Sequence, residues 1–112
     1  MAKYNVEIAE TALWTLEDIE SFNAERIGAQ QAASLADKLL TDSVRTLEVD
    51  PTRYRFSARL ANKGLNLRER ITPDGKYIVI YDFDGENVWI LLFLSTRQDL
   101  EGLLHRYVIT ME

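Results

Sequence analysis

The chain from Leu65 to Arg97 contains three strand-like runs of apolar and polar residues, separated by two turn signals. The first turn signal lies within Thr72–Lys76, where Pro is followed by Asp-Gly, and the second is Asp84-Gly85. Proline presets one turn dihedral, and glycine tolerates the positive φ that tight turns need. This pattern predicts a three-strand antiparallel meander.

The third run, Val88–Leu94, is apolar at every position, which predicts a central strand with both faces covered. The first run alternates, so it places Arg68 and Arg70 together on the face away from Leu67 and Ile71.

The middle run also alternates, with a strongly aromatic face. That face carries Tyr77, Val79, Tyr81 and Phe83, and the other carries Ile78, Ile80 and Asp82. The meander is therefore predicted to present a cationic and aromatic surface on a rigid sheet.

Before the meander, the sequence predicts an edge strand and a first helix. Alternation turns Tyr4, Val6 and Ile8 inward, and a helix from about Ala12 to Arg26 follows an N-cap at Thr11. The helix has an apolar stripe of Ala12, Leu16, Ile19 and Ile27, flanked by Leu13 and Phe22. Trp14 points nearly opposite this stripe, which leaves two possibilities: burial under another element, or an exposed interface anchor.

A second amphipathic helix is predicted from about Ala29 to Leu47, after Gly28 and before Pro51. Two such helices joined by a short link predict an antiparallel hairpin packed on one face of the sheet. The stretch Pro51–Gly64 has no clean period and is predicted to be an ordered loop anchored by Tyr54 and Phe56.

Residues after Arg97 predict a short terminal helix that starts at Gln98-Asp99, or alternatively a strand at Val108–Thr110. The predicted class is α+β in the order β-α-α-β-β-β, with a mostly antiparallel sheet and a short C-terminal helix. At 112 residues the whole chain, 1–112, is predicted to form one domain.

The amino-acid composition excludes several kinds of functional site. The chain has no cysteine and one histidine, His105, so disulfides, thiolate sites and multi-histidine metal sites are excluded, and no cofactor is expected. No signal peptide or membrane span is recognised, which predicts a cytoplasmic protein.

The net charge of −5 conceals a segregation of charge along the chain. Residues 7–25 hold six acids and no base. Residues 51–70 hold one acid, Glu69, and six bases: Arg53, Arg55, Arg59, Lys63, Arg68 and Arg70. Local charge sets the field that a partner meets, so this basic segment is a candidate anion-binding surface; a solvated loop with scattered arginines is the alternative.

Arg68 and Arg70, with Arg97 after the last strand, form the strongest cationic set. Arginine grips phosphates or carboxylates in a fork, although strand arginines also pair with neighbouring acids.

The aromatic and histidine candidates each have two interpretations. Tyr77 and Tyr81 could stack bases or serve as ordinary strand formers. His105 could act as a general acid or base, or lie idle on the surface. Paired carboxylates, phosphate-binding glycine loops and nucleophile motifs are absent from the sequence.

The order and length of the elements resemble the RelE/ParE toxins of bacterial type II toxin–antitoxin, or plasmid-stabilisation, systems. The resemblance covers essentially the whole chain. It is sharpest in three stretches that look like the family's "LR…YRVIY…V.I..I.H.R.D" pattern: Leu67–Ile71, Tyr77–Tyr81, and Val88–Ile90 through Ser95–Asp99.

The resemblance implies one of two targets. RelE-type members cut messenger RNA on the ribosome with basic residues and often a C-terminal tyrosine, whereas ParE-type members poison DNA gyrase. Here Ile78 stands where the nucleases commonly carry an arginine, and their tyrosine position falls at Leu103, one turn before Tyr107. The long helical hairpin and the acidity also favour the ParE branch.

The sequence therefore predicts a ParE-like toxin that binds DNA gyrase and is neutralised by a cognate antitoxin in a hetero-oligomer. The alternative is a ribosome-dependent mRNA endonuclease, with Arg68, Arg70 and Arg97 as phosphate clamps and Tyr107 or His105 as proton carrier. A non-toxic interaction domain on the same fold is the third possibility.

Two sets of partner-binding residues follow. The candidate antitoxin contacts are Trp14, Trp89 and Phe93. The candidate target or anion contacts are Arg53, Arg55, Arg59, Arg68, Arg70, Tyr77, Tyr81 and Arg97.

Overall fold

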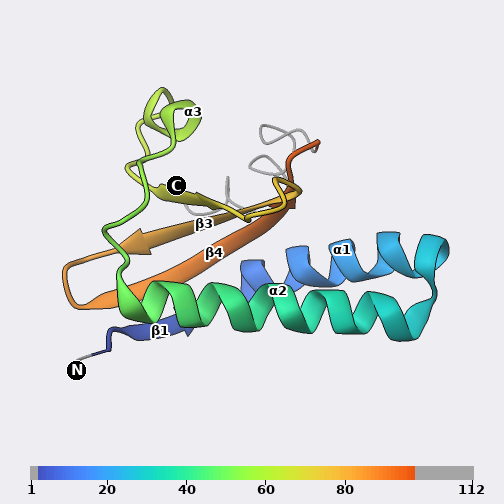
Figure 1. The fold of residues 1–112 in the computed structure, drawn as a ribbon. Helices are drawn as coiled ribbons and strands as arrows, with labels where there is room; N and C mark the ends of the chain where they lie inside the picture. The colour runs from blue at the N-terminus through green and yellow to red at the C-terminus, as the bar shows by residue number, and fades with distance from the viewer. Residues whose placement is uncertain (1–2, 98–112) are drawn as a thin grey trace.

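A four-stranded mixed sheet with a helical hairpin on one face forms the fold, which a computed structural model describes over residues 3–97 (Figure 1). The elements are β1 (Asn5–Ile8), α1 (Glu10–Ile27), α2 (Ala29–Val49), α3 (Ala58–Ala61), β2 (Arg68–Ile71), β3 (Tyr77–Phe83) and β4 (Asn87–Ser95). The strand order is β1-β4-β3-β2, with β1 parallel to β4 and the other neighbours antiparallel. The predicted class, meander and edge position of β1 are confirmed.

The two turns of the meander form as their residues predict. Gly75 and Gly85 have φ of 73° and 104°, in the region that glycine favours. The hydrogen bond from the Thr72 hydroxyl, reinforced by one from a backbone N–H, holds the pKa of Asp74 below its usual range. Backbone N–H groups do the same for Asp84.

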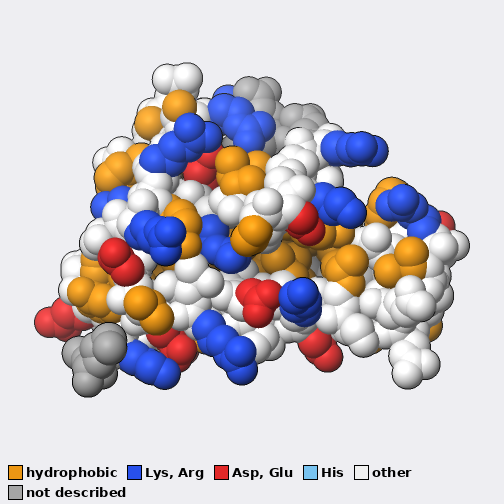
Figure 2. Space-filling view, viewed as in Figure 1, with side chains coloured by type: hydrophobic (Ala, Val, Ile, Leu, Met, Phe, Trp, Pro, Cys, Tyr) orange, Lys and Arg blue, Asp and Glu red, His pale blue; other side chains and the backbone are white. Residues whose placement is uncertain are grey.

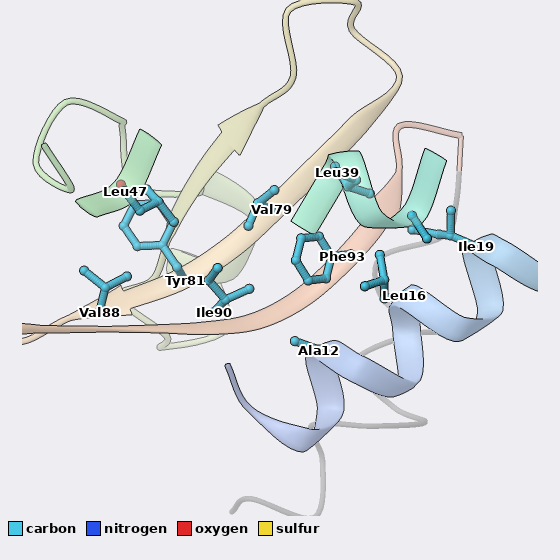
Figure 3. Close-up of a cluster of buried hydrophobic side chains, with 11 residues drawn as sticks. Ala12, Leu16, Ile19, Leu39, Leu47, Val79, Tyr81, Val88, Ile90 and Phe93 are labelled. Carbon is cyan, nitrogen blue, oxygen red and sulfur yellow. The ribbon is translucent and has the colours of Figure 1, made fainter. Parts of the chain in front are cut away.

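The core lies on both faces of the sheet, as the all-apolar run Val88–Leu94 within β4 predicts. Between the sheet and the helical hairpin it contains Ala12, Leu16, Ile19, Ala36, Leu39, Leu47, Val79, Tyr81, Val88, Ile90 and Phe93 (Figure 3). On the opposite face it contains Leu60, Ile78, Ile80, Leu92 and Leu94. The amphipathic character predicted for the second helix is confirmed, since one side of it is buried or packed against the first cluster: Ala32, Leu35, Ala36, Leu39, Leu40, Ser43 and Leu47.

The hairpin turns at Gly28, whose φ is 90°, but its helices begin and end differently from the prediction. Helix α1 begins at Glu10 after Ala9, so the prediction of Thr11 as N-cap was wrong. Helix α2 continues to Val49, two residues beyond the predicted end.

The predicted apolar stripe of α1 holds only in its first half. Ile19 is buried, whereas Phe22 and Ile27 are 64% and 40% exposed. The buried stripe continues instead at Asn23, whose side-chain amide donates to the carbonyl of Ile19 at 2.8 Å. The cause is the reach of the hairpin: its tip extends past the strands, so apolar side chains there have no sheet to cover (Figure 1).

A β-bulge in β4 changes which side chains face the hairpin. Ile80 lies opposite Leu92 and Tyr81 lies opposite Ile90, so Leu91 is the extra residue. Beyond the bulge the alternation is offset by one, and the side chain that faces the helices is Phe93.

Two threonines of α1 form hydrogen bonds with backbone groups of β4 beyond the point where β1 stops pairing with that strand. The Thr11 hydroxyl donates to the carbonyl of Leu91 at 2.7 Å. The Thr15 hydroxyl accepts the N–H of Phe93 at 3.0 Å and donates to the carbonyl of Ala12 at 2.9 Å. Helix α1 thereby takes over the edge of β4 that β1 leaves open.

We expect Thr15→Val to lower the free energy of unfolding by about 1–3 kcal/mol, because it leaves the buried N–H of Phe93 without an acceptor. Thr15→Ser keeps the hydroxyl and should recover most of that loss. Urea denaturation of the three proteins measures the difference. Equal stability of the valine and serine variants would contradict this role for the hydroxyl.

The predicted loop after Pro51 contains the short helix α3 and covers the second face of the sheet. Ser57 caps α3 by accepting the N–H of Leu60 at 3.4 Å, and Leu60 is fully buried. Tyr54 packs against the hairpin-side core as predicted, but Phe56 is 52% exposed, so its prediction as an anchor was wrong. The predicted terminal helix and the alternative strand at Val108–Thr110 lie outside the described residues.

Candidate functional site

Arg68 lies on the hairpin side of the sheet, opposite Tyr81 in the strand register. Its guanidinium donates to the carbonyl oxygens of Thr52 at 3.3 Å and Tyr54 at 2.6 Å. It also stacks over the ring of Phe56, 4.2 Å from the ring centroid. Arg68 therefore ties the segment after α2 to the sheet.

Arg70 lies on the same side of the sheet and is only 6% exposed. Its guanidinium donates to the hydroxyl of Ser43 on α2 at 3.4 Å. Within residues 3–97, no carboxylate forms an ion pair with it. Because Arg70 is buried against α2, an incoming carboxylate or phosphate cannot reach its guanidinium without displacing the hairpin.

The predicted aromatic face is mostly internal. Tyr81 is fully buried and its hydroxyl donates to the carbonyl of Pro51, so its ring is closed to an incoming base. Burial raises the pKa of the Tyr81 phenol well above its usual value. Tyr77 is partly buried, and its hydroxyl accepts the side-chain amide of Asn23 at 3.4 Å.

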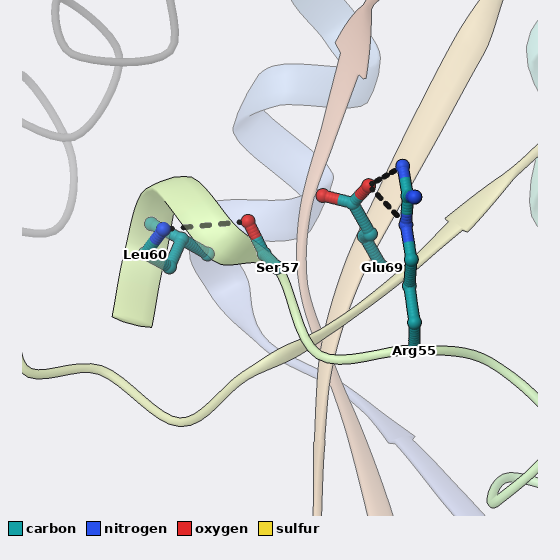
Figure 4. A network of polar contacts seen from close by, with 4 residues as sticks. All are labelled: Arg55, Ser57, Leu60 and Glu69. Atoms are coloured by element: carbon teal, nitrogen blue, oxygen red, sulfur yellow. Dashed lines mark hydrogen bonds and ion pairs between the residues drawn. The ribbon is translucent and has the colours of Figure 1, made fainter. Parts of the chain in front are cut away.

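The cations that reach solvent lie elsewhere: Arg53, Arg55, Arg59 and Arg97 are all exposed. Cationic side chains gather over α3 and the strands beside it on the face shown in Figure 2. Arg55, although 75% exposed, forms an ion pair at 3.0 Å with Glu69, which is 8% exposed (Figure 4). The three arginines predicted to form one cationic set are thus divided, because Arg68 and Arg70 face the hairpin and Arg97 follows the end of β4.

A pocket of about 270 Å³ lies where the α3 segment meets β2 on the second face of the sheet. Its lining is Arg55, Phe56, Ala58, Arg59, Glu69, Ile71 and Ile78. Two cations, one acid and exposed apolar groups line this pocket, which suits an apolar side chain next to a carboxylate.

Of the predicted antitoxin contacts, Trp14 is 43% exposed on α1 and Trp89 is partly buried on β4. Phe93 is fully buried between α1 and the sheet (Figure 3). A partner cannot reach Phe93 without opening the core, so its prediction as a surface contact was wrong. The reason is the bulge at Leu91, which turns Phe93 toward the helices.

His105 and Tyr107, the predicted proton carriers, lie outside the described residues. Within residues 3–97, no group of three or more potential ligands from His, Cys, Asp and Glu could hold a metal ion. None of the helices in that part of the chain has the length and apolar content that a membrane span requires.

Comparison of the sequence with models of known protein families shows which family the chain belongs to. The family model described as "ParE toxin of type II toxin-antitoxin system, parDE" matches residues 6–100. The chain belongs to the ParE toxin family. It is therefore the toxin of a type II toxin–antitoxin system, as its resemblance to the RelE/ParE toxins implied.

The fold of this ParE toxin is similar to that of a solved chain from the "Chromosomal ParDE TA system from P. aeruginosa", with a TM-score of 0.61. The alignment covers 83% of this chain and 96% of that chain, at 15% sequence identity. No curated protein sequence matches the chain.

Sequence reasoning missed the pocket of this ParE toxin, although it singled out several of its residues separately. Phe56 was predicted as an anchor of the loop, and Ile71 was placed on the face of its strand away from Arg68 and Arg70; they are 52% and 44% exposed. No local pattern signals such a pocket, because its walls come from the α3 segment and from β2. The one available signal was an aromatic residue inside the most basic stretch of the chain.

Proposed function

We propose that this toxin poisons DNA gyrase, and that a cognate antitoxin neutralises it. Membership of the ParE family supports the proposal. One observation of the structure argues against the alternative, RNA cleavage. Arg68 and Arg70, the arginines that an RNA-cleaving relative would use as phosphate clamps, face the helical hairpin and are engaged by Tyr54 and Ser43.

Cleavage of RNA requires groups that move protons and groups that stabilise the developing phosphorane charge, gathered on one accessible surface. The position that the nucleases fill with an arginine is Ile78, which is buried on the opposite face of the sheet. Arg97 alone of the predicted clamps is exposed. A toxin that acts by binding gyrase does not need catalytic residues gathered on one surface.

The proposed target surface contains Arg53, Arg59 and Arg97, the exposed cations of the predicted set other than Arg55, which is ion-paired with Glu69. An antitoxin that covers this surface would carry an acidic tail with spaced apolar residues. Such a tail folds on binding, opposite charge speeds the encounter, and apolar anchors then hold the complex.

Expression without antitoxin should induce the DNA-damage response and filamentation. Purified toxin added to gyrase and supercoiled plasmid should trap gyrase on cleaved DNA, seen as linear plasmid after proteolysis. Co-expression with the antitoxin is the control and should abolish both effects.

Primer extension on translated message, run in parallel, should show no new cuts. Two results would contradict the gyrase proposal: translation that stops while DNA stays intact, and codon-dependent cuts in the message that Arg97→Ala abolishes. The target would then be the ribosome.

A further inference from the structure

The outer edge of β2 is paired along only half of its length. The N–H of Ser57 donates to the carbonyl of Leu67 at 2.8 Å, and the N–H of Glu69 donates to the carbonyl of Arg55 at 3.0 Å. This short pairing with the segment before α3 ends at Glu69. The rest of β2 is therefore an edge strand without a neighbour in the described part of the chain.

Strand geometry identifies the free backbone groups. The N–H of Thr72 donates to the carbonyl of Tyr77 on the β3 side at 2.9 Å, and that of Glu69 points outward to Arg55. Because these directions alternate along an antiparallel strand, the C=O of Glu69 and the N–H and C=O of Ile71 point outward. Within residues 3–97 no hydrogen bond reaches these three groups.

The pocket of about 270 Å³ adjoins this free edge, since Glu69 and Ile71 line it. The carboxylate of Glu69 is neutralised by Arg55 at 3.0 Å (Figure 4). Arg59 is exposed and forms no ion pair with the described residues, which leaves the pocket cationic. Ile71, which is 44% exposed, supplies exposed apolar surface, whereas the ring of Phe56 is stacked on Arg68.

We propose that an extended segment of the antitoxin adds a strand to the outer edge of β2. Its backbone pairs with the free groups of Glu69 and Ile71, an apolar side chain enters the pocket against Ile71, and a carboxylate binds Arg59. Main-chain pairing supplies affinity in this mode of recognition, and the pocket supplies specificity. This inference rests on the proposed neutralisation by an antitoxin and gives it a location.

Charge favours the antitoxin over a second copy of this chain as the occupant. Pairing of two β2 edges would bring together two copies of the same cationic pocket, and like charges in contact oppose association. An acidic segment is complementary to Arg59 and leaves the ion pair between Arg55 and Glu69 intact.

The test uses the full chain and its cognate antitoxin. Ile71→Pro removes the outward N–H without removing a bond to β3, whereas Ile71→Ala removes the side chain and keeps the N–H. We expect the proline variant to bind about tenfold more weakly than the alanine variant in calorimetric titration. In the wild-type protein, hydrogen exchange at the Ile71 amide should slow at least about tenfold on binding.

A second pair of variants tests the charge. Arg59→Glu should weaken binding by about fivefold or more, mainly through slower association. Arg45→Glu makes the same charge change at an exposed position of α2, outside the pocket, and should change affinity less than about twofold.

The outcomes separate this inference from the function on which it rests. Tight binding with unchanged exchange at Ile71 and equal affinities of the proline and alanine variants would overturn the β2 site, while neutralisation by an antitoxin stands. Self-association of the chain that Ile71→Pro abolishes would overturn it in favour of a second copy. Failure of the wild-type chain to bind the antitoxin would refute the proposed neutralisation itself.

Discussion

Phe93→Ala should lower the free energy of unfolding by about 3–5 kcal/mol, a large share of the roughly 5–15 kcal/mol that holds a domain of this size together. The ring is fully buried between α1 and the sheet, among residues that include Leu16 and Leu39. Its removal loses apolar burial and leaves a cavity that these neighbours fill only in part. Thermal unfolding followed by circular dichroism should show a midpoint lower by roughly 10 °C or more.

Phe22→Ala is the matched control, because it removes the same side chain from an α1 position that is 64% exposed. It should change stability by no more than about 0.5 kcal/mol. Any loss of antitoxin binding by Phe93→Ala should then follow from unfolding and should recover at temperatures where the variant is folded. A stable Phe93→Ala protein that still fails to bind would return Phe93 to the interface.

Trp14→Ala should weaken antitoxin binding by more than about tenfold while the melting temperature stays nearly unchanged. Trp14 is 43% exposed on the outer face of α1, next to Leu13, which is 42% exposed. Truncation of a tryptophan buried at an interface typically costs more than about 2 kcal/mol of binding free energy. Calorimetric titration of the wild-type and variant toxins with the antitoxin measures the change.

Val49→Ala controls for the loss of any exposed apolar group, since Val49 is 63% exposed at the end of α2. Its affinity should stay within about twofold of wild type. Unchanged affinity of Trp14→Ala would remove Trp14 from the interface. A large drop in the melting temperature of Trp14→Ala would instead show that Trp14 is buried under another element and stabilises the fold.

The sequence by itself determined the four strands and the two long helices of this protein, and the grouping of side chains within each strand of the meander. Period-two alternation predicted that Arg68 and Arg70 share a face of their strand and that Tyr77, Val79 and Tyr81 share a face of theirs. Both groupings are confirmed, and the register of β2 with β3 places the two groups on the same side of the sheet. The turns at Asp74-Gly75 and Asp84-Gly85 were equally clear. Such features depend on residues that are neighbours in sequence, so local patterns contain them.

The family was also readable from the sequence, because its motifs follow one another at fixed spacing along the chain. The residues of the candidate site could be predicted only in part from the sequence. Basic residues between positions 53 and 70 were recognised as a group, but their division into internal and exposed members was not. Arg68 is held by Thr52 and Tyr54, and Arg70 by Ser43 of α2, contacts that no period along β2 encodes.

Only the tertiary structure decided which face of the meander the hairpin covers. Alternation groups side chains but does not say which group meets the helices, since that depends on packing between α1, α2 and the strands. One extra residue, Leu91, reversed the assignment for the end of β4 and placed Phe93 in the core. The open edge of β2 and its pocket likewise arise where the α3 segment stops pairing, because long-range contacts, not local patterns, determine where a strand is left without a neighbour.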